Sequence, residues 1–182
     1  MNFSRGYTLI ELLVGLVIIS ILITLAQAAY ARISDSVHLS SARSSLTDSL
    51  MLSISRSVTY LDPVVLCPSQ DGARCLDTFD WSIGWLGFVD DDGNGVRSDN
   101  EKIITRQMAI ADGLTLVTSE GRRRLRFQVG GSNFGSNVTF SFCSEQSGAL
   151  IETLVLSNTG KLHRETPSNE SSGAVCATNQ VL

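Results

Sequence analysis

The sequence predicts an α+β protein in which one long N-terminal helix packs on an antiparallel β-sheet head. Residues 9–61 contain no proline and pass from an apolar run into an amphipathic one, which is the pattern of a single continuous helix. From Val64 onward, short β-type runs alternate with clusters of glycine, asparagine, aspartate and serine. That alternation is typical of strands joined by short turns, which favour antiparallel pairing.

The helix is expected to begin in an apolar segment behind a short leader, residues 1–6, which carries one cation, Arg5. As a helix, the run from Leu9 to Ala29 is about 30 Å long, enough to cross the hydrocarbon core of a bilayer. Glu11 is the only charged residue in this run. A carboxylate in lipid is costly unless it is neutralised or paired, so Glu11 is a candidate functional residue. Residues 7–29 are predicted to form a transmembrane or filament-core segment.

Residues 30–61 are expected to continue the helix with an amphipathic face. Apolar residues recur there at intervals near four, among serine, arginine and aspartate. These residues are Ile33, Val37, Leu46, Leu50, Ile54 and Val58. Asp62-Pro63 ends the pattern, because the residue before a proline disfavours helix.

Residues 62–182 are predicted to form the β-rich head, with about seven strands. The predicted strands are 64–67, 85–89, 102–108, 114–118, 125–129, 138–143 and 151–156. A turn at Asn158-Thr159-Gly160 predicts a hairpin into residues 161–164. The tail after Thr166 is small and polar, and we expect it to be loosely held except at Cys176.

The composition indicates an exported protein. The net charge of −4 argues against a wholly basic nucleic-acid binder but leaves room for a local basic patch. An even count of cysteines beyond the apolar segment predicts two disulfides in an oxidising bacterial compartment. Three pairings are possible, of which we favour Cys67–Cys75, closing a short loop, and Cys143–Cys176, tying the tail to the sheet. A zinc site is the alternative, but the sequence has no Cys-x-x-Cys spacing and its two histidines are far apart.

Residues 6–11, Gly-Tyr-Thr-Leu-Ile-Glu, resemble the class III leader junction of type IV pilins and pseudopilins. The resemblance implies that a prepilin peptidase cuts after Gly6 and methylates the new N-terminal residue, Tyr7, where the family usually has phenylalanine. It also implies that Glu11 pairs with the free amine of a neighbouring subunit and so sets the axial register. Two alternatives are a signal peptide cleaved near Ala26-Gln27-Ala28 and a plain single-pass anchor.

The head resembles that of FimT/GspH-type minor pilins and pseudopilins. The similar motifs are Leu66-Cys67-Pro68, Trp81-x-x-Gly84-Trp85, Phe88-x-Asp90, Asp99-x-Glu101, Phe140-x-Phe142-Cys143 and the run 160–164. The resemblance implies a minor type IV pilin that helps pilus assembly or initiation at the filament tip, with other minor and major pilins as partners, and not an enzyme. It implies a bacterial inner-membrane protein with a periplasmic head, which later enters the filament. The alternative is the H-type minor pseudopilin of a type II secretion system.

Residues 90–101 fit the calcium-loop pattern D-x-[DN]-x-[DN]-G-x5-E. The predicted oxygen donors are the side chains of Asp90, Asp92, Asn94 and Glu101 and the carbonyl of Val96. The flanks are predicted strands and not helices, so a solvated hairpin loop is the alternative. We expect no cofactor other than this possible calcium ion.

Two basic stretches are candidate DNA contacts. In a strand, Arg122, Arg124 and Arg126 would share one face and offer three guanidinium groups to phosphates. A solvated outer face or a subunit contact is the alternative. The second stretch holds Lys161, His163 and Arg164, of which Lys161 and Arg164 are the candidate contacts. FimT-like minor pilins of natural transformation carry Gly-Arg-x-Arg near this position, but here Arg164 lies one residue later, which in a strand moves it to the opposite face.

Overall fold

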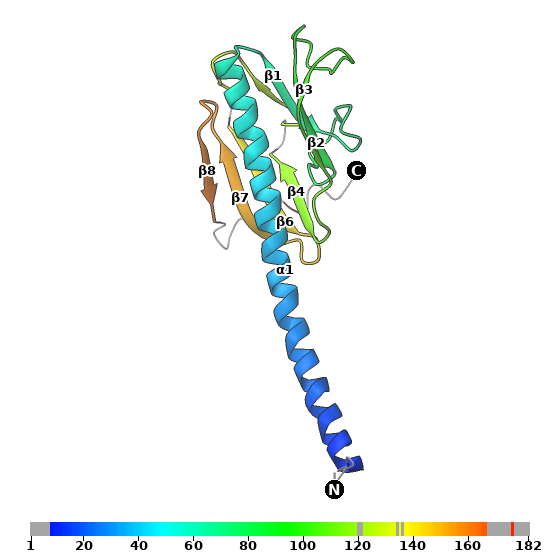
Figure 1. Cartoon of the computed structure of the whole chain (residues 1–182). Coiled ribbons are helices and arrows are strands. Elements are labelled where there is room, and N and C mark those ends of the chain that lie inside the picture. Colours follow the sequence, from blue (N-terminus) through cyan, green and yellow to red (C-terminus); the bar gives the residue numbers. More distant parts are fainter. Residues whose placement is uncertain (1–7, 120–121, 134, 136, 167–175, 177–182) are drawn as a thin grey trace. The chain divides into compact units, whose positions relative to one another are not determined.

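The structure is a computed structural model that describes residues 8–119, 122–133, 135, 137–166 and 176 (Figure 1). For residues 25–35 it describes the backbone alone. The chain divides into two compact units, Met1–Val37 and His38–Leu182. One helix, α1, runs from Leu9 to Thr59 through both units.

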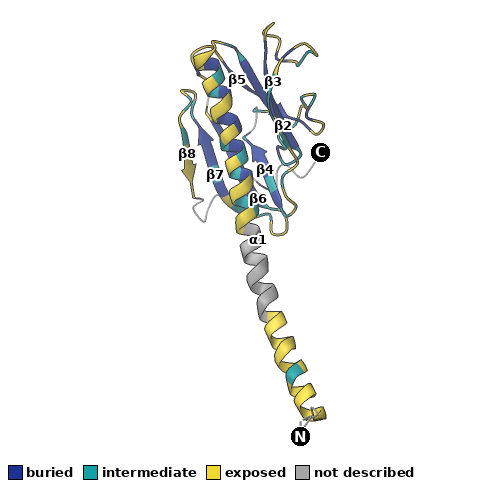
Figure 2. Ribbon diagram, in the orientation of Figure 1, coloured by how far each residue is buried: buried dark blue, intermediate teal, exposed yellow. Residues whose placement is uncertain are grey.

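In the first unit, the described leucine, isoleucine and valine side chains between Leu9 and Ile23 are all exposed (Figure 2). Among the helical residues whose side chains the structure describes, no stretch is both long enough and apolar enough to cross a membrane.

In the second unit, α1 packs on the head through leucines and small residues. Leu46 and Leu50 are fully buried, as the amphipathic pattern predicts. The prediction is wrong for Val58, which is 49% exposed. Val37, the last residue of the first unit, is 56% exposed, and Ile33 lies outside the described side chains. The inner face is instead completed by Ala42, Ser49, Ser53 and Ser57.

Buried serines are tolerated on this face because their hydroxyls bond to the helix's own carbonyls. Ser53 Oγ donates to the Ser49 carbonyl at 2.7 Å, and Ser57 Oγ donates to the Ile54 carbonyl at 2.8 Å. Small side chains also let a helix approach its neighbours closely. Hydropathy alone therefore misplaced part of the buried stripe.

The head holds two four-stranded antiparallel sheets, with strand orders β3-β2-β1-β5 and β4-β6-β7-β8. The strands are β1 Val64–Pro68, β2 Gly84–Val89, β3 Ile103–Met108, β4 Leu114–Thr118, β5 Leu125–Phe127, β6 Val138–Ser144, β7 Leu150–Leu156 and β8 Leu162–Glu165. The antiparallel prediction is confirmed, and the predicted turn at residues 158–160 joins β7 to β8. Gly160 has a φ of 81°, and its N–H donates to the Ser157 carbonyl at 3.0 Å.

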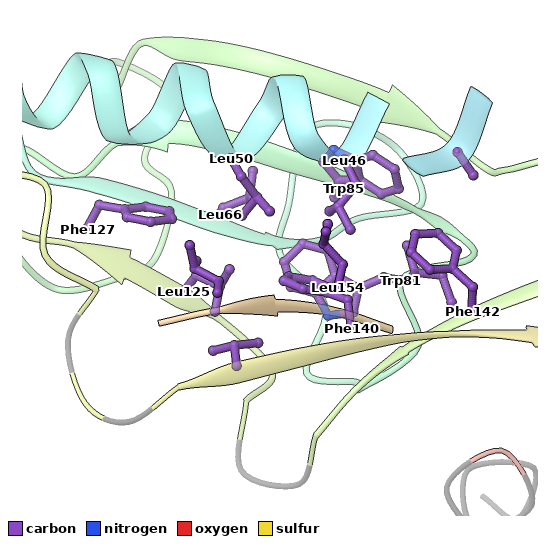
Figure 3. Close-up of a cluster of buried hydrophobic side chains, with 14 of the residues drawn as sticks. Leu46, Leu50, Leu66, Trp81, Trp85, Leu125, Phe127, Phe140, Phe142 and Leu154 are labelled. Atoms are coloured by element: carbon purple, nitrogen blue, oxygen red, sulfur yellow. The ribbon is translucent and has the colours of Figure 1, made fainter. Parts of the chain in front are cut away.

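The main core lies between α1 and the inner faces of the two sheets (Figure 3). Its large aromatic members include Trp81, Trp85 and Phe140, all fully buried. Trp81 and Phe140 meet edge to face with ring centroids 5.3 Å apart, a favoured aromatic geometry. Trp85 Nε1 donates to the Ser49 hydroxyl at 2.9 Å, which ties β2 to the helix.

A second, smaller core covers the opposite face of β1 and β2. It is formed by Val65, Cys67, Leu86 and Phe88, which alternate along the strands with members of the main core. All residues of β1 and β2 are therefore buried.

Both disulfides have the pairing favoured from the sequence. Cys67 and Cys75 are joined with Cα atoms 5.5 Å apart. Cys143 of β6 and Cys176 are joined with Cα atoms 6.0 Å apart, which fixes one residue of the C-terminal segment to the second sheet.

Candidate functional site

The N-terminus of α1 is capped by Thr8 and Glu11. The Thr8 backbone N–H and hydroxyl donate to Glu11 Oε2 at 2.8 and 2.9 Å, and the Glu11 N–H donates to Thr8 Oγ1 at 3.4 Å. This reciprocal arrangement is a capping box, and its signature T-x-x-E is visible in the sequence. Both residues are exposed, so the carboxylate is accessible at the start of the helix. The predicted cleavage residues Gly6 and Tyr7 lie outside the described residues.

Three carboxylates converge in the loop between β2 and β3. Oxygen atoms of Asp90, Asp92 and Glu101 lie within 4.8 Å of one another. Asp90 and Glu101 are 3% and 4% exposed, whereas Asp92 is exposed. Two buried carboxylates at this separation repel each other, and a bound cation would offset that repulsion.

Backbone N–H groups of the loop hold the two buried carboxylates in place. Gly95 donates to both oxygens of Asp90 at 3.0 and 3.1 Å. Asp91 and Ser98 donate to Glu101 Oε1 and Oε2 at 3.0 and 2.7 Å. The carboxylate set suits Ca²⁺, which prefers hard oxygen donors. A cation at this site would be bound by oxygens that already face one another.

The other two residues predicted to supply calcium donors, Asn94 and Val96, are exposed. Asn94 Oδ1 accepts the Val96 N–H at 2.6 Å, and Asn94 Nδ2 donates to Asp92 Oδ2 at 2.6 Å. The Val96 side chain is 58% exposed. As expected from the sequence, the elements that flank the loop are strands.

The first basic stretch packs against this same loop. Arg124 Nη1 donates to the Gly95 carbonyl at 2.9 Å, and Arg126 Nη2 donates to the Asn94 carbonyl at 3.3 Å. A Cβ at Gly95 would collide with the Arg126 guanidinium. The acidic loop and the basic stretch, separate in sequence, are therefore brought together.

The predicted row of arginines on a single strand is not observed. Strand β5 begins at Leu125, so Arg122 and Arg124 precede it, and Arg126 alone has the expected place between two buried residues. The neighbouring Arg123 forms an ion pair with Asp77 at 2.7 Å and lies over the ring of Phe79.

His163 and Arg164 are consecutive residues of β8 and therefore lie on opposite faces, as predicted from the one-residue offset of Arg164. Arg164 Nε lies 3.1 Å from Glu152 Oε2, while His163 Nε2 contacts Glu165 Oε1 at 3.0 Å. Lys161 is exposed and precedes the strand. Strands β5 and β8 belong to different sheets, so the two basic stretches do not lie on one sheet.

Arg97 of the acidic loop contacts the short loop that the Cys67–Cys75 disulfide closes. No sequence pattern predicted this contact. Arg97 Nη1 donates to the Ala73 carbonyl at 3.2 Å. Beside it, the N–H groups of Ala73 and Arg74 donate to Asp71 Oδ1 at 2.8 and 2.9 Å. The bond from Ala73 has the larger effect, and the two bonds together hold the pKa of Asp71 below its ordinary value.

A long N-terminal helix with an antiparallel head and a Thr8–Glu11 cap defines a type IV pilin-like protein. The chain belongs to the GspH family, because the family model described as type II transport protein GspH matches residues 42–160. The prokaryotic N-terminal methylation motif matches residues 1–26, which contain the predicted leader junction. No curated protein sequence matches the chain.

Two crystal structures of the type IV minor pilin FimU from Pseudomonas aeruginosa share the fold. The first has a TM-score of 0.55 and 18% identity, covering 79% of this chain and 98% of FimU. The second has a TM-score of 0.54 and 19% identity, covering 75% and 98%. The minor pseudopilin EpsH from the type 2 secretion system of Vibrio cholerae has a TM-score of 0.46 and 14% identity, covering 70% of this chain and 97% of EpsH.

Proposed function

We propose that this chain is a minor type IV pilin, a structural subunit that helps to assemble or initiate a pilus at its tip. The observation that carries the proposal is the exposed Glu11 carboxylate at the start of a helix whose apolar side chains are also exposed. In this account, a prepilin peptidase cuts after Gly6, and the inner membrane holds the segment until assembly.

The exposed apolar side chains from Leu9 to Ile23 need a partner. Covering apolar surface is favourable by about 25 cal/mol per Å². Lipid would cover this surface before assembly, and helices of other pilins would cover it afterwards. Among those helices, Glu11 would form an ion pair with the free N-terminal amine of a neighbouring subunit, because an unpaired carboxylate is costly in an apolar environment.

The test replaces Glu11 by alanine and measures how much of the variant is present in filaments sheared from the cells. Glu11→Ala is expected to leave the protein inserted and stable but absent from filaments. Asp48→Ala is the matched control, because Asp48 is an exposed carboxylate farther along the same helix. Equal incorporation of both variants would remove the argument for axial register.

The second candidate is the H-type minor pseudopilin of a type II secretion system, which the family description favours. Both machines would use the same leader and the same helix. Deleting the gene separates them. Loss of pili with normal protein secretion supports the pilus, and loss of secretion with normal pili supports the secretion system.

We also propose that the loop of Asp90, Asp92 and Glu101 binds calcium, with Asn94 and the Val96 carbonyl as further donors. The convergence of three carboxylates, two of them buried, supports this proposal. Titration calorimetry should detect binding that Asp92→Ala and Glu101→Ala abolish. Asp99→Ala is the control in the same loop, because Asp99 is exposed and stands outside the cluster. Absence of heat would favour a solvated turn.

DNA contact by Arg122, Arg124, Arg126, Lys161 and Arg164 is a further proposal. Its support is the exposure of Arg126 and Lys161, whereas Arg164 already holds Glu152. Binding to phosphates would weaken steeply as salt rises. Arg126→Ala or Lys161→Ala should reduce binding of the full chain to duplex DNA, and the exposed Arg74→Ala should not. Absence of binding at low salt would exclude DNA contact.

A further inference from the structure

The side chains of the acidic loop also form an arrangement that could carry out chemistry without a metal. Asn94 is followed by Gly95. The Gly95 N–H and the Oδ1 and Nδ2 atoms of Asn94 each form a hydrogen bond within the loop. We propose that Asn94-Gly95 is a self-modification site, at which the folded loop promotes conversion of Asn94 to aspartate or isoaspartate. The proposal does not depend on calcium or on assembly into a filament.

The nucleophile is the Gly95 nitrogen. Its N–H points at the Asp90 carboxylate, with N···O distances of 3.0 and 3.1 Å. That carboxylate is 3% exposed, so water does not compete strongly for it. Asp90 is therefore in place to accept the proton when the nitrogen attacks, which is the role of a positioned general base.

The electrophile is the Asn94 carboxamide. Its Oδ1 accepts the Val96 N–H at 2.6 Å, and this donor would stabilise the negative charge that develops on the oxygen. Its Nδ2 donates to Asp92 Oδ2 at 2.6 Å, which fixes the leaving nitrogen. Gly95 has no side chain to obstruct the approach and has a φ of 72°, which glycine adopts freely.

The reaction balances with water alone. The Gly95 nitrogen gives its proton to Asp90 and bonds to Asn94 Cγ, while the C=O electron pair moves onto Oδ1. That pair returns as the Cγ–Nδ2 bond breaks, and ammonia leaves with the proton from Asp90. Water, which reaches the exposed Asn94, then opens the cyclic imide at either carbonyl. The products are aspartate and isoaspartate, and no oxidant or reductant takes part.

The product would change the loop irreversibly. Aspartate adds a carboxylate beside Asp92, and isoaspartate lengthens the backbone by one methylene group just before Gly95. The carbonyls of Asn94 and Gly95 accept hydrogen bonds from Arg126 and Arg124. A lengthened backbone would displace both carbonyls from the two guanidinium groups.

The test follows the mass of the peptide containing residue 94 in the full chain, held in detergent with a chelator. The imide is seen as loss of the mass of ammonia, and the products as later gain of the mass of water. The folded chain should react roughly tenfold faster than the same chain unfolded in urea, because the general base is in place only when folded. A folded rate equal to or below the unfolded rate would overturn the proposal.

Two variants locate the effect. Asp90→Asn should slow the folded reaction by about a hundredfold, the lower end of what a positioned general base contributes. Asp99→Asn makes the same charge change in the same loop and should leave the rate unchanged. Equal rates in both variants would contradict the role of Asp90. The comparison of folded with unfolded wild-type chain decides the proposal even if Asp90→Asn misfolds.

Discussion

Arg43 of α1 donates to both carboxylate oxygens of Glu152 in β7, at 2.9 and 3.2 Å. Glu152 is 2% exposed, and Nε of Arg164 in β8 contacts Oε2 of the same carboxylate at 3.1 Å. One buried acid therefore joins the helix to two strands of the second sheet. A buried charge of this kind depends on its partners, because burial removes the water that would otherwise solvate it.

Removing Arg43 should destabilise the head more than removing Arg164. Arg43→Ala leaves a buried carboxylate with one partner, and we expect a loss of about 3 kcal/mol, the range for breaking a buried pair. Arg164 is more exposed, so Arg164→Ala should cost about 1 kcal/mol. Urea unfolding of the full chain in mild detergent measures both, and equal losses would contradict the account.

Ser49→Ala should be costly for a small change on the helix. The substitution leaves the buried Trp85 Nε1 without its acceptor at 2.9 Å, and an unmet buried donor costs about 1–3 kcal/mol. Ser44→Ala, on the exposed face of the same helix, is the control and should have little effect. A similar stability for the two variants would show that the Trp85 contact contributes nothing.

Gly84→Ala should prevent folding or come close to it. Gly84 has a φ of 107°, and a Cβ there would collide with the Gln107 carbonyl and lie 2.9 Å from the Ser69 carbonyl oxygen. Both obstacles are backbone, so the loss should reach about 4 kcal/mol. Gly93→Ala is the control, because Gly93 also has a positive φ but nothing near its missing Cβ. Soluble yield and thermal unfolding of the two variants should differ sharply.

The disulfide loop should loosen at low pH. Because the pKa of Asp71 is lowered in the fold, its contribution is complete above the unfolded value of 3.8 and is lost as pH falls through the folded pKa. Amide signals of Ala73 and Arg74 should report this titration by NMR, since both groups donate to Asp71. Asp71→Asn should abolish the response, and an unchanged titration in that variant would assign it to another group.

Much of the fold could be predicted from local signals. Asp62-Pro63 lies three residues after the end of α1, and the alternation of apolar residues located the strands within a few positions. The turn at residues 158–160 was predictable because Gly160 adopts a positive φ freely. The pairing of Cys67 with Cys75 followed from their short separation. These features depend on neighbours in the chain.

The features that sequence reasoning missed depend on residues far apart in the chain. Val58 has the right spacing for the core, yet it is exposed and the neighbouring Ser57 is buried. Arg124 appears in sequence as a free cation, but its partner is the Gly95 carbonyl. The division into two sheets likewise depends on which strands pair, and strand spacing alone does not determine that.

The intact mass of the chain, extracted from the membranes of cells that contain the prepilin peptidase, tests the central claim most directly. The account predicts loss of residues 1–6 and the addition of one methyl group at Tyr7. A peptidase-deficient strain is the control and should retain the whole leader. A mature chain that begins at Ala29, or a leader retained in both strains, would contradict the assignment as a pilin subunit.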